Sequence, residues 1–359
     1  MPMIKRTSAL FFLFIFINII SLLYIFSSSS WIRIWVGIEL NLYSFLFLLI
    51  LPPSQDASPQ PITAALSYFI VQAVRSLIFI LGIFLATQNF FTYSLWLIVL
   101  ALLIKIGAAP FHFWVPWVSL NSSWPSLFWL LTFQKLPPLF LLQNFFYLIP
   151  SSSLLLNLIL SASIFSALIG GLLGLFQTRL QSLLAYSSIN QTAWFLLASI
   201  IASNILIFYY TLYLLILFPI CLLMSYSPIK APFFSPPISN LTLTQSTLII
   251  LIFLNLAGIP PLAIFCMKIT IFFTLSTSLF ILFVFFTLIL GSAYSTFYYL
   301  QFILNCFSTP QHLPKLLTQP IFSPTLFILS GLSLLIPLAL FYSSMTCANS
   351  LTKTYNFHL

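Results

Sequence analysis

Residues 91–119 read FTYSLWLIVLALLIKIGAAPFHFWVPWVS, an apolar stretch interrupted by Gly107 and Pro110. A helix rises about 1.5 Å per residue and the hydrocarbon core of a bilayer is about 30 Å thick, so about 20 apolar residues span it. Glycine and proline release backbone groups from the helix ladder, and at membrane depth such breaks are tolerated where protein or a water-filled cavity satisfies those groups. The stretch therefore predicts a membrane helix that is broken part of the way along.

Apolar runs of similar length recur along the whole chain, which predicts an all-α polytopic membrane protein. Of the 359 residues, 61% are hydrophobic and 4% are charged, whereas about 25% are charged in an ordinary soluble domain. We expect about eleven transmembrane helices in one membrane domain, residues 1–359. Their ranges are 8–26, 31–51, 62–86, 91–119, 123–148, 152–175, 179–203, 204–226, 240–275, 277–306 and 321–343.

A second broken segment carries LAGIPPLAIF at residues 256–265. Each break falls in the fourth helix of a five-helix block, and the blocks are residues 8–148 and 152–306. An odd number of spans in each block makes the two blocks opposite in topology, which is typical of inverted-repeat transporters. The helix at 321–343 then stands outside both repeats. The simpler reading is two ordinary helix kinks.

The basic residues are unevenly distributed between the connecting loops. Five of them fall on the side of the N-terminus and two on the other side, which places the N-terminus on the inner side and the C-terminus outside. The first apolar run, about 19 residues long, exceeds the core of a cleaved secretory signal, roughly 7 to 15 residues. We therefore expect no removable targeting segment.

Several classes of function are excluded by what the chain lacks. The four cysteines form no CxxC pair, and neither GxGxxG nor GxxxxGK[ST] occurs. Only two acidic residues are present, too few for a carboxylate-bridged metal centre. The basic residues form no cluster that tracks phosphates, which excludes nucleic acid as a partner. We expect neither a cofactor nor a metal in this chain.

Five charged residues fall at membrane depth, where each costs about 2.5 to 3.5 kcal/mol on insertion scales. They are Glu39, Arg75, Lys105, Lys135 and Lys268. Desolvation disfavours the charged form of lysine, which suits a group that accepts and releases a proton. The expected position of Lys135, near the middle of the segment 123–148, is too deep for its side chain to reach the membrane surface. A proton relay is the favoured reading, and structural ion pairs are the alternative.

Two further residues are harder to assign from the sequence. His112, two residues after Pro110, is a candidate relay between lysines, since its reference pKa near 6.5 suits proton transfer; the alternative is a hydrogen-bonded histidine that fills the helix break. Arg75 does not deprotonate in proteins, so it cannot carry protons itself. It is expected either to pair with Glu39 or to orient lipid.

Five segments together resemble one known family. KIGAAPFHFWVP, LLTFQKLPPL, WVGIELNLYSF, LLAYSSI and AGIPPLAIFCMK are similar to the subunit 2 family of mitochondrial NADH dehydrogenase (ubiquinone), an antiporter-like membrane-arm subunit of respiratory complex I. The resemblance runs in order over residues 31–275. It implies that the family's buried glutamate is Glu39 and that its relay lysines are Lys105, Lys135 and Lys268. Arg75 stands where a small or polar residue is expected in this family, which leaves open how Glu39 is paired.

The resemblance also implies a function and a location. It implies proton translocation coupled to NADH-to-quinone electron transfer in partner subunits, which bind NADH, FMN, iron–sulfur clusters and ubiquinone. The partners are other membrane-arm subunits and inner-membrane phospholipids. The location is the mitochondrial inner membrane, with the N-terminus in the matrix and the C-terminus in the intermembrane space. Two alternatives stay open: a stand-alone cation/proton antiporter and a purely structural membrane module.

Overall fold

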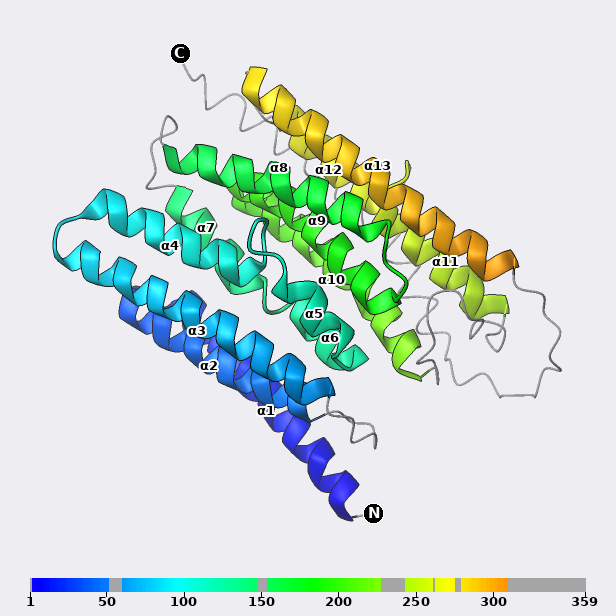
Figure 1. The fold of residues 1–359 in the computed structure, drawn as a ribbon, viewed down its shortest axis with the longest axis horizontal. Coiled ribbons are helices and arrows are strands. Elements are labelled where there is room, and N and C mark those ends of the chain that lie inside the picture. Colours follow the sequence, from blue (N-terminus) through cyan, green and yellow to red (C-terminus); the bar gives the residue numbers. More distant parts are fainter. Residues whose placement is uncertain are drawn as a thin grey trace. The chain divides into compact units, whose positions relative to one another are not determined.

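The computed structural model describes residues 2–51, 60–146, 154–226, 243–260, 262–274 and 279–308. These ranges fold into helices joined by short turns and contain no strand (Figure 1). The helices are α1 Pro2–Ser27, α2 Trp31–Ile50, α3 Gln60–Thr87, α4 Phe91–Ile106, α5 Trp114–Leu120, α6 Trp124–Leu131, α7 Leu136–Phe146, α8 Leu154–Gly174, α9 Leu180–Ile201, α10 Ser203–Tyr226, α11 Leu243–Ala257, α12 Ala263–Thr274 and α13 Leu279–Ser308.

Six of these helices are long and apolar enough to cross a membrane: α1, α2, α3, α8, α10 and α13. Their spanning segments are 19 to 27 residues long, which matches the thickness of a bilayer core. The prediction of an all-α polytopic membrane protein is confirmed. The predicted helix at 321–343 lies outside the described residues.

Both predicted helix breaks are present. The segment 91–119 forms α4 and α5, which are separated by residues 107–113, and the segment 240–275 forms α11 and α12, which are separated at 258–262. Gly107 and Gly258 have positive φ angles of 74° and 75°. This left-handed conformation ends a helix and strongly favours glycine, so the breaks follow directly from the local sequence.

A third break was not predicted. The segment 123–148 was expected to be one continuous helix, but residues 132–135 form a turn between α6 and α7. Pro137 and Pro138 explain the difference, since proline cannot donate an amide hydrogen bond and its ring clashes with the carbonyl four residues earlier. Both prolines stand in the first turn of α7, where a helix tolerates them. The expectation that Lys135 lies mid-helix is therefore wrong; it lies in this break.

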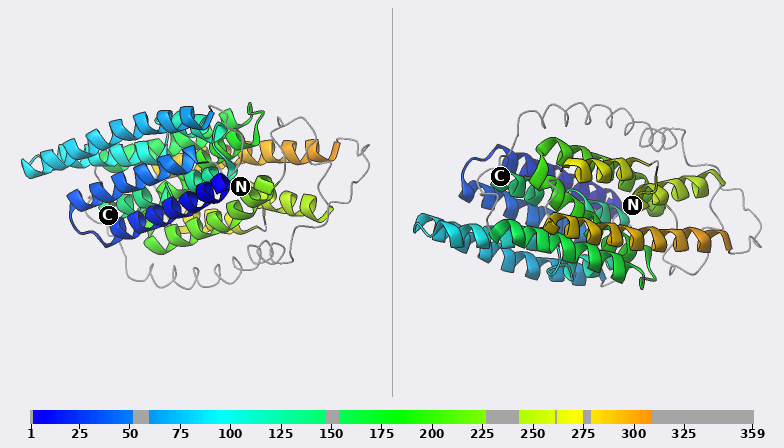
Figure 2. Two further views of the ribbon diagram at one scale, coloured as in Figure 1. Left: turned by 90° about the horizontal axis from the view of Figure 1, so that it is seen from below. Right: turned by 90° about the horizontal axis from the view of Figure 1, so that it is seen from above.

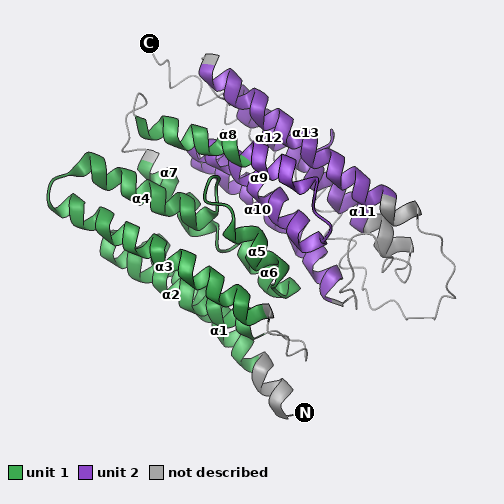
Figure 3. Ribbon diagram, in the orientation of Figure 1, with its two compact units in different colours: residues 1–166 green, residues 167–359 purple. Residues whose placement is uncertain are grey.

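The chain divides into two compact units, residues 1–166 and residues 167–359 (Figure 3). In unit 1, α1 packs against α2, and α3 packs against both α2 and α4. The long helices of the unit lie side by side along a common direction (Figure 2). Buried polar residues join α1 to α2: Asn18 Nδ2 donates to Ser44 Oγ at 3.0 Å and Asn41 Nδ2 donates to Ser21 Oγ at 3.3 Å. Such bonds hold helices together where lipid provides no hydrophobic driving force.

Unit 2 contains α9, which is buried along most of its length and packs against α10, α12 and α13. Glycines allow the helix backbones to approach closely. A Cβ added to Gly170 would lie 2.6 Å from the backbone nitrogen of Asn190 in α9, and one added to Gly291 in α13 would lie 2.5 Å from the carbonyl oxygen of Ala167. These small-residue contacts are typical of membrane helix packing.

Candidate functional site

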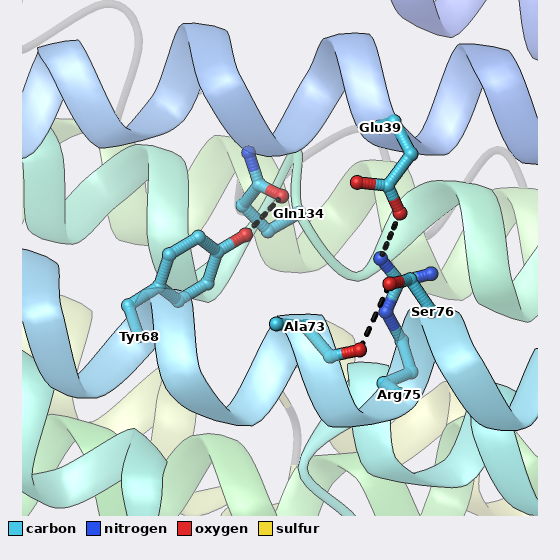
Figure 4. A network of polar contacts seen from close by, with 6 residues as sticks. All are labelled: Glu39, Tyr68, Ala73, Arg75, Ser76 and Gln134. Atoms are coloured by element: carbon cyan, nitrogen blue, oxygen red, sulfur yellow. Dashed lines mark hydrogen bonds and ion pairs between the residues drawn. The ribbon is translucent and has the colours of Figure 1, made fainter.

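Glu39 in α2 and Arg75 in α3 form an ion pair in which Arg75 is buried and Glu39 is partly exposed. Arg75 Nη2 donates to Glu39 Oε1 at 3.3 Å, and the side chains are 1% and 16% exposed, respectively (Figure 4). The pair answers the question that the sequence left open, because Arg75 is a direct partner of Glu39. Isolated charges are very costly in an apolar bundle, so each side chain stabilises the other.

Lys105 lies in the last turn of α4 and is 2% exposed. It is close enough to Glu39 and Arg75 for both charges to act on its ammonium group. Arg75 opposes a positive charge on Lys105, whereas Glu39 favours one. Among the residues that the structure describes, Nζ of Lys105 has no hydrogen-bond partner. Lys105 is therefore a buried amine with two charged side chains in the same unit.

In the break that follows Lys105, hydrogen bonds connect the chain back to the last turn of α4. The Gly107 amide donates to the carbonyls of Leu103 and Ile104, both at 3.1 Å, and the Ala108 amide donates to Leu103. Trp114 Nε1 donates to the Ile104 carbonyl at 3.1 Å. These bonds satisfy the carbonyl groups of Leu103 and Ile104, two of those that the end of α4 would otherwise leave unpaired.

His112 lies inside this break and is 2% exposed. Its Nδ1 is 3.2 Å from the Pro110 carbonyl oxygen, which fits a donor at Nδ1. No hydrogen-bond partner of Nε2 exists within the described ranges. With Nδ1 protonated, Nε2 is the ring nitrogen that is left to accept a proton.

Lys135 lies at the end of the turn between α6 and α7 and is 2% exposed. The neighbouring Gln134 connects this turn to α3, because Tyr68 Oη donates to Gln134 Oε1 at 3.1 Å (Figure 4). Tyr68 is also within electrostatic range of Glu39 and Arg75. Tyr68 thus contacts the turn that carries Lys135 from α3, the helix that also carries Arg75.

Lys268 belongs to unit 2, in α12, and is 7% exposed. Its Nζ lies 5.2 Å from the centroid of the Trp194 ring, a cation–π distance. A Cβ added to Gly258 would lie 3.1 Å from the same Nζ. The side chain of Lys268 therefore reaches back to the second helix break.

The structure brings some of the candidate residues together. Glu39 and Arg75 form an ion pair, and Lys105 and Lys135 lie in the same unit as this pair. Lys268 belongs to the other unit. Sequence reasoning missed Tyr68, although it precedes Arg75 by seven residues, which puts both on one face of α3.

Within the described ranges, no group of three or more His, Cys, Asp or Glu side chains lies together as a metal site would require. Cys221 and Cys266 are free thiols. The charged side chains at these positions are one carboxylate, one arginine and three lysines, and among the cations only the lysines can release and take up a proton.

The fold and these buried charges define a class of protein. A family model described as NADH:quinone oxidoreductase/Mrp antiporter matches residues 28–292, and the chain belongs to this family. All four candidate relay residues, Glu39, Lys105, Lys135 and Lys268, lie within the matched range.

Curated relatives indicate which members of this family the chain is similar to. NADH-ubiquinone oxidoreductase chain 2 of Lumbricus terrestris is 31% identical over 302 residues, which is 82% of this chain and 86% of the relative. NADH-ubiquinone oxidoreductase chain 2 of Anopheles gambiae is 37% identical over 262 residues, 69% of this chain and 72% of the relative. Within the family, these chain 2 proteins are the group that this chain is similar to.

Solved structures share the fold. A chain of respiratory complex I from Thermus thermophilus with bound aureothin matches with a TM-score of 0.76 and 22% identity, covering 92% of this chain and 78% of that chain. A chain of the Mrp complex from Dietzia sp. matches with a TM-score of 0.78 and 14% identity, covering 93% of this chain and 75% of that chain.

Proposed function

We propose that this chain is a proton-translocating, antiporter-like subunit of an NADH:ubiquinone oxidoreductase in the mitochondrial inner membrane. The observation that carries the proposal is that the two glycine-containing breaks each have a buried lysine beside them, Lys105 and Lys268. A charge costs several kcal/mol at membrane depth and is a functional candidate by default. The similarity to chain 2 proteins supports the same assignment.

The first step takes place in unit 1, where Glu39 moves between Arg75 and Lys105. When Glu39 pairs with Arg75, the ammonium form of Lys105 loses a nearby negative charge and is disfavoured. When Glu39 turns to Lys105, that form is favoured. Lys105 thus takes up or releases a proton as the carboxylate moves, and no bond other than N–H changes.

The second step passes the proton toward Lys135 and then Lys268, with His112 as a further relay group. Carrying one charge against 100 mV costs about 2.3 kcal/mol. Neither a glutamate nor a lysine supplies that free energy, so it comes from redox chemistry in partner subunits. Those subunits bind NADH, FMN, iron–sulfur clusters and ubiquinone.

The proposal includes a topology. The chain has eleven spans, with inverted repeats at 8–148 and 152–306 and an extra helix at 321–343. The N-terminus is on the matrix side and the C-terminus is in the intermembrane space. The partners are other membrane-arm subunits of complex I and inner-membrane phospholipids. The two glycine breaks, in corresponding helices of the two blocks, support this repeat layout.

The second candidate function is a stand-alone cation/proton antiporter, which is favoured by the shared fold of the Mrp chain. The two functions differ in their need for partners. An antiporter exchanges ions in liposomes as a purified single chain, whereas a complex I subunit moves protons only when NADH is oxidised in the assembled complex. Transport by the isolated chain would favour the antiporter.

The experiment replaces Lys135 or Lys268 by Met and Glu39 by Gln in the assembled complex. We expect the number of protons moved per NADH oxidised to fall in proteoliposomes, while the complex still assembles. Arg33→Gln, at an exposed position in α2, is the matched control and retains full pumping. Full pumping in all three buried variants would contradict the proposal and would favour a structural module.

A further inference from the structure

Lys268 has no acidic side chain in its own unit to pair with. The chain has two acidic residues, Glu39 and Asp56, and both precede unit 2, which begins at residue 167. Nζ of Lys268 also has no hydrogen-bond partner among the described residues. A buried ammonium group is costly unless it is paired, so some other group must favour the charged form if Lys268 is to hold a proton at membrane depth.

Trp194 of α9 is the side chain that lies against this lysine. Nζ of Lys268 is over the face of the indole ring, 5.2 Å from the ring centroid. Trp194 is 3% exposed and Lys268 is 7% exposed, so water screens the contact only weakly. A cation within about 6 Å of a ring centroid is attracted by the negative face of the ring, and the attraction is larger in a desolvated site.

The choice of tryptophan at this position has a cost. Trp194 is the only tryptophan in residues 130–359, although the chain has 8 tryptophans and 41 phenylalanines. The indole Nε1 has no hydrogen-bond partner in the described ranges, so the ring leaves a buried donor unsatisfied. Phenylalanine would occupy the site without that cost. The indole face attracts a cation more strongly than a phenyl face does, which is an advantage at Trp194 because a cation lies over it.

A helix end favours a cation at the same place. α11 ends at Ala257, and the side chain of Lys268 reaches Gly258, directly after this end. The unpaired carbonyl groups of a helix C-terminus carry a partial negative charge that attracts a cation within about one turn. A substitution at Trp194 leaves this helix end unchanged, so the contribution of the ring can be measured separately.

We propose that Trp194 is a positioning residue for Lys268, whose ring face takes the place of a carboxylate counter-ion. The inference rests on the proposed function, because it explains how the relay lysine of unit 2 holds its proton. The ring attracts the ammonium form far more strongly than the neutral amine, so it favours proton uptake and opposes release. On release one N–H bond breaks and the proton passes to a water molecule. The ring cannot accept that proton, whereas a carboxylate partner would compete for it.

Other titratable groups on the helices that pack against α12 are uncharged in their ordinary range at neutral pH. α12 packs against α9, α10 and α11, and α11 has no titratable side chain. The groups are Tyr186 in α9, the tyrosines and Cys221 in α10, and Cys266 in α12 itself. Arg179 is a charged residue at the start of α9, but it precedes Trp194 by 15 residues, about 22 Å along the helix. A change in the charge of Lys268 is therefore the expected electrostatic effect of a substitution at Trp194.

The test compares four variants in the assembled complex. Trp194→Leu removes the ring, and Trp194→Phe keeps a smaller ring with a weaker face. Phe195→Leu, at the next position of α9 and also buried, is the matched control for loss of an aromatic side chain. Lys268→Met is the reference for loss of the cation. Protons moved per NADH oxidised are measured in proteoliposomes over a series of pH values, together with quinone reduction in the presence of an uncoupler.

We expect the alkaline limit of pumping to move to lower pH by about one unit in Trp194→Leu, because the ammonium form of Lys268 loses roughly tenfold in its equilibrium with the amine. Trp194→Phe should shift the limit by less, and Phe195→Leu should keep the wild-type pH profile. Adding Trp194→Leu to Lys268→Met should change the profile no further. Uncoupled quinone reduction should stay intact in all variants.

Three results would overturn the role of Trp194. They are a wild-type pH profile in Trp194→Leu, an equal shift in Phe195→Leu, and a further shift when Trp194→Leu is added to Lys268→Met. Should Trp194→Leu fail to assemble, a wild-type profile in Trp194→Phe overturns it as well. Each of these results beside reduced pumping in Lys268→Met leaves the proposed function standing, whereas full pumping in Lys268→Met would overturn both.

Discussion

Replacing Arg75 tests how strongly the Glu39–Arg75 ion pair couples α2 to α3. Arg75 Nη2 lies 3.3 Å from Glu39 Oε1, and the side chains are 1% and 16% exposed. Coulomb's law with an effective dielectric constant of about 20 gives about 5 kcal/mol for two unit charges at this distance. Partial exposure of Glu39 screens the interaction, so we expect a coupling free energy of about 2–4 kcal/mol.

The assay is a double-mutant cycle with Arg75→Gln, Glu39→Gln and the double variant in the assembled complex. Each single variant leaves one buried charge without its partner, so the two losses together exceed the loss in the double variant. The denaturant midpoint for loss of quinone reduction, converted with a common slope, gives each free energy. Arg33→Gln is the control and should stay within about 0.5 kcal/mol of the wild type. Losses that simply add would refute the pair as a stabilising interaction.

Three further substitutions test the helix breaks and the polar contacts. Gly258→Ala forces a left-handed alanine, which costs about 1–2 kcal/mol, and places a methyl group 3.1 Å from Lys268 Nζ; we expect a lower thermal midpoint and weaker pumping, and unchanged values for both would contradict this. Tyr68→Phe removes the bond to Gln134 and should cost about 0.5–1.5 kcal/mol in the same denaturant assay. Asn41→Leu removes hydrogen bonds between α1 and α2 and should lower stability by about 0.6 kcal/mol, at most about 1.7; a more stable variant would show that apolar packing alone suffices there.

The sequence predicts the helix breaks well where glycine decides them. Gly107 and Gly258 both have the positive φ angle that ends a helix, and this conformation depends on the residue itself rather than on its distant neighbours. The turn at 132–135 was missed because Pro137 and Pro138 lack a glycine beside them, and apolar length alone favours a continuous helix. Proline in fact removes hydrogen bonds on its N-terminal side, and the turn that carries Lys135 lies there.

The pairing of charges was not predictable to the same degree. Glu39 and Arg75 are 36 residues apart, and their contact depends on which face α3 turns toward α2. Periodicity places Tyr68 and Arg75 on one face of α3 but does not say which helix that face meets. A sequence pattern indicates which residues share one face of a helix, whereas tertiary packing decides which other helix that face contacts.

The two breaks place their lysines differently, and this difference has a physical consequence. Lys105 precedes Gly107 and has Glu39 and Arg75 in the same unit, and in the proposed function its protonation follows the movement of the Glu39 carboxylate. Lys268 follows Gly258 and lies against an indole ring and the backbone of the break, neither of which carries a charge that can move. We therefore expect substitutions around Lys105 to change how pumping depends on the redox reaction.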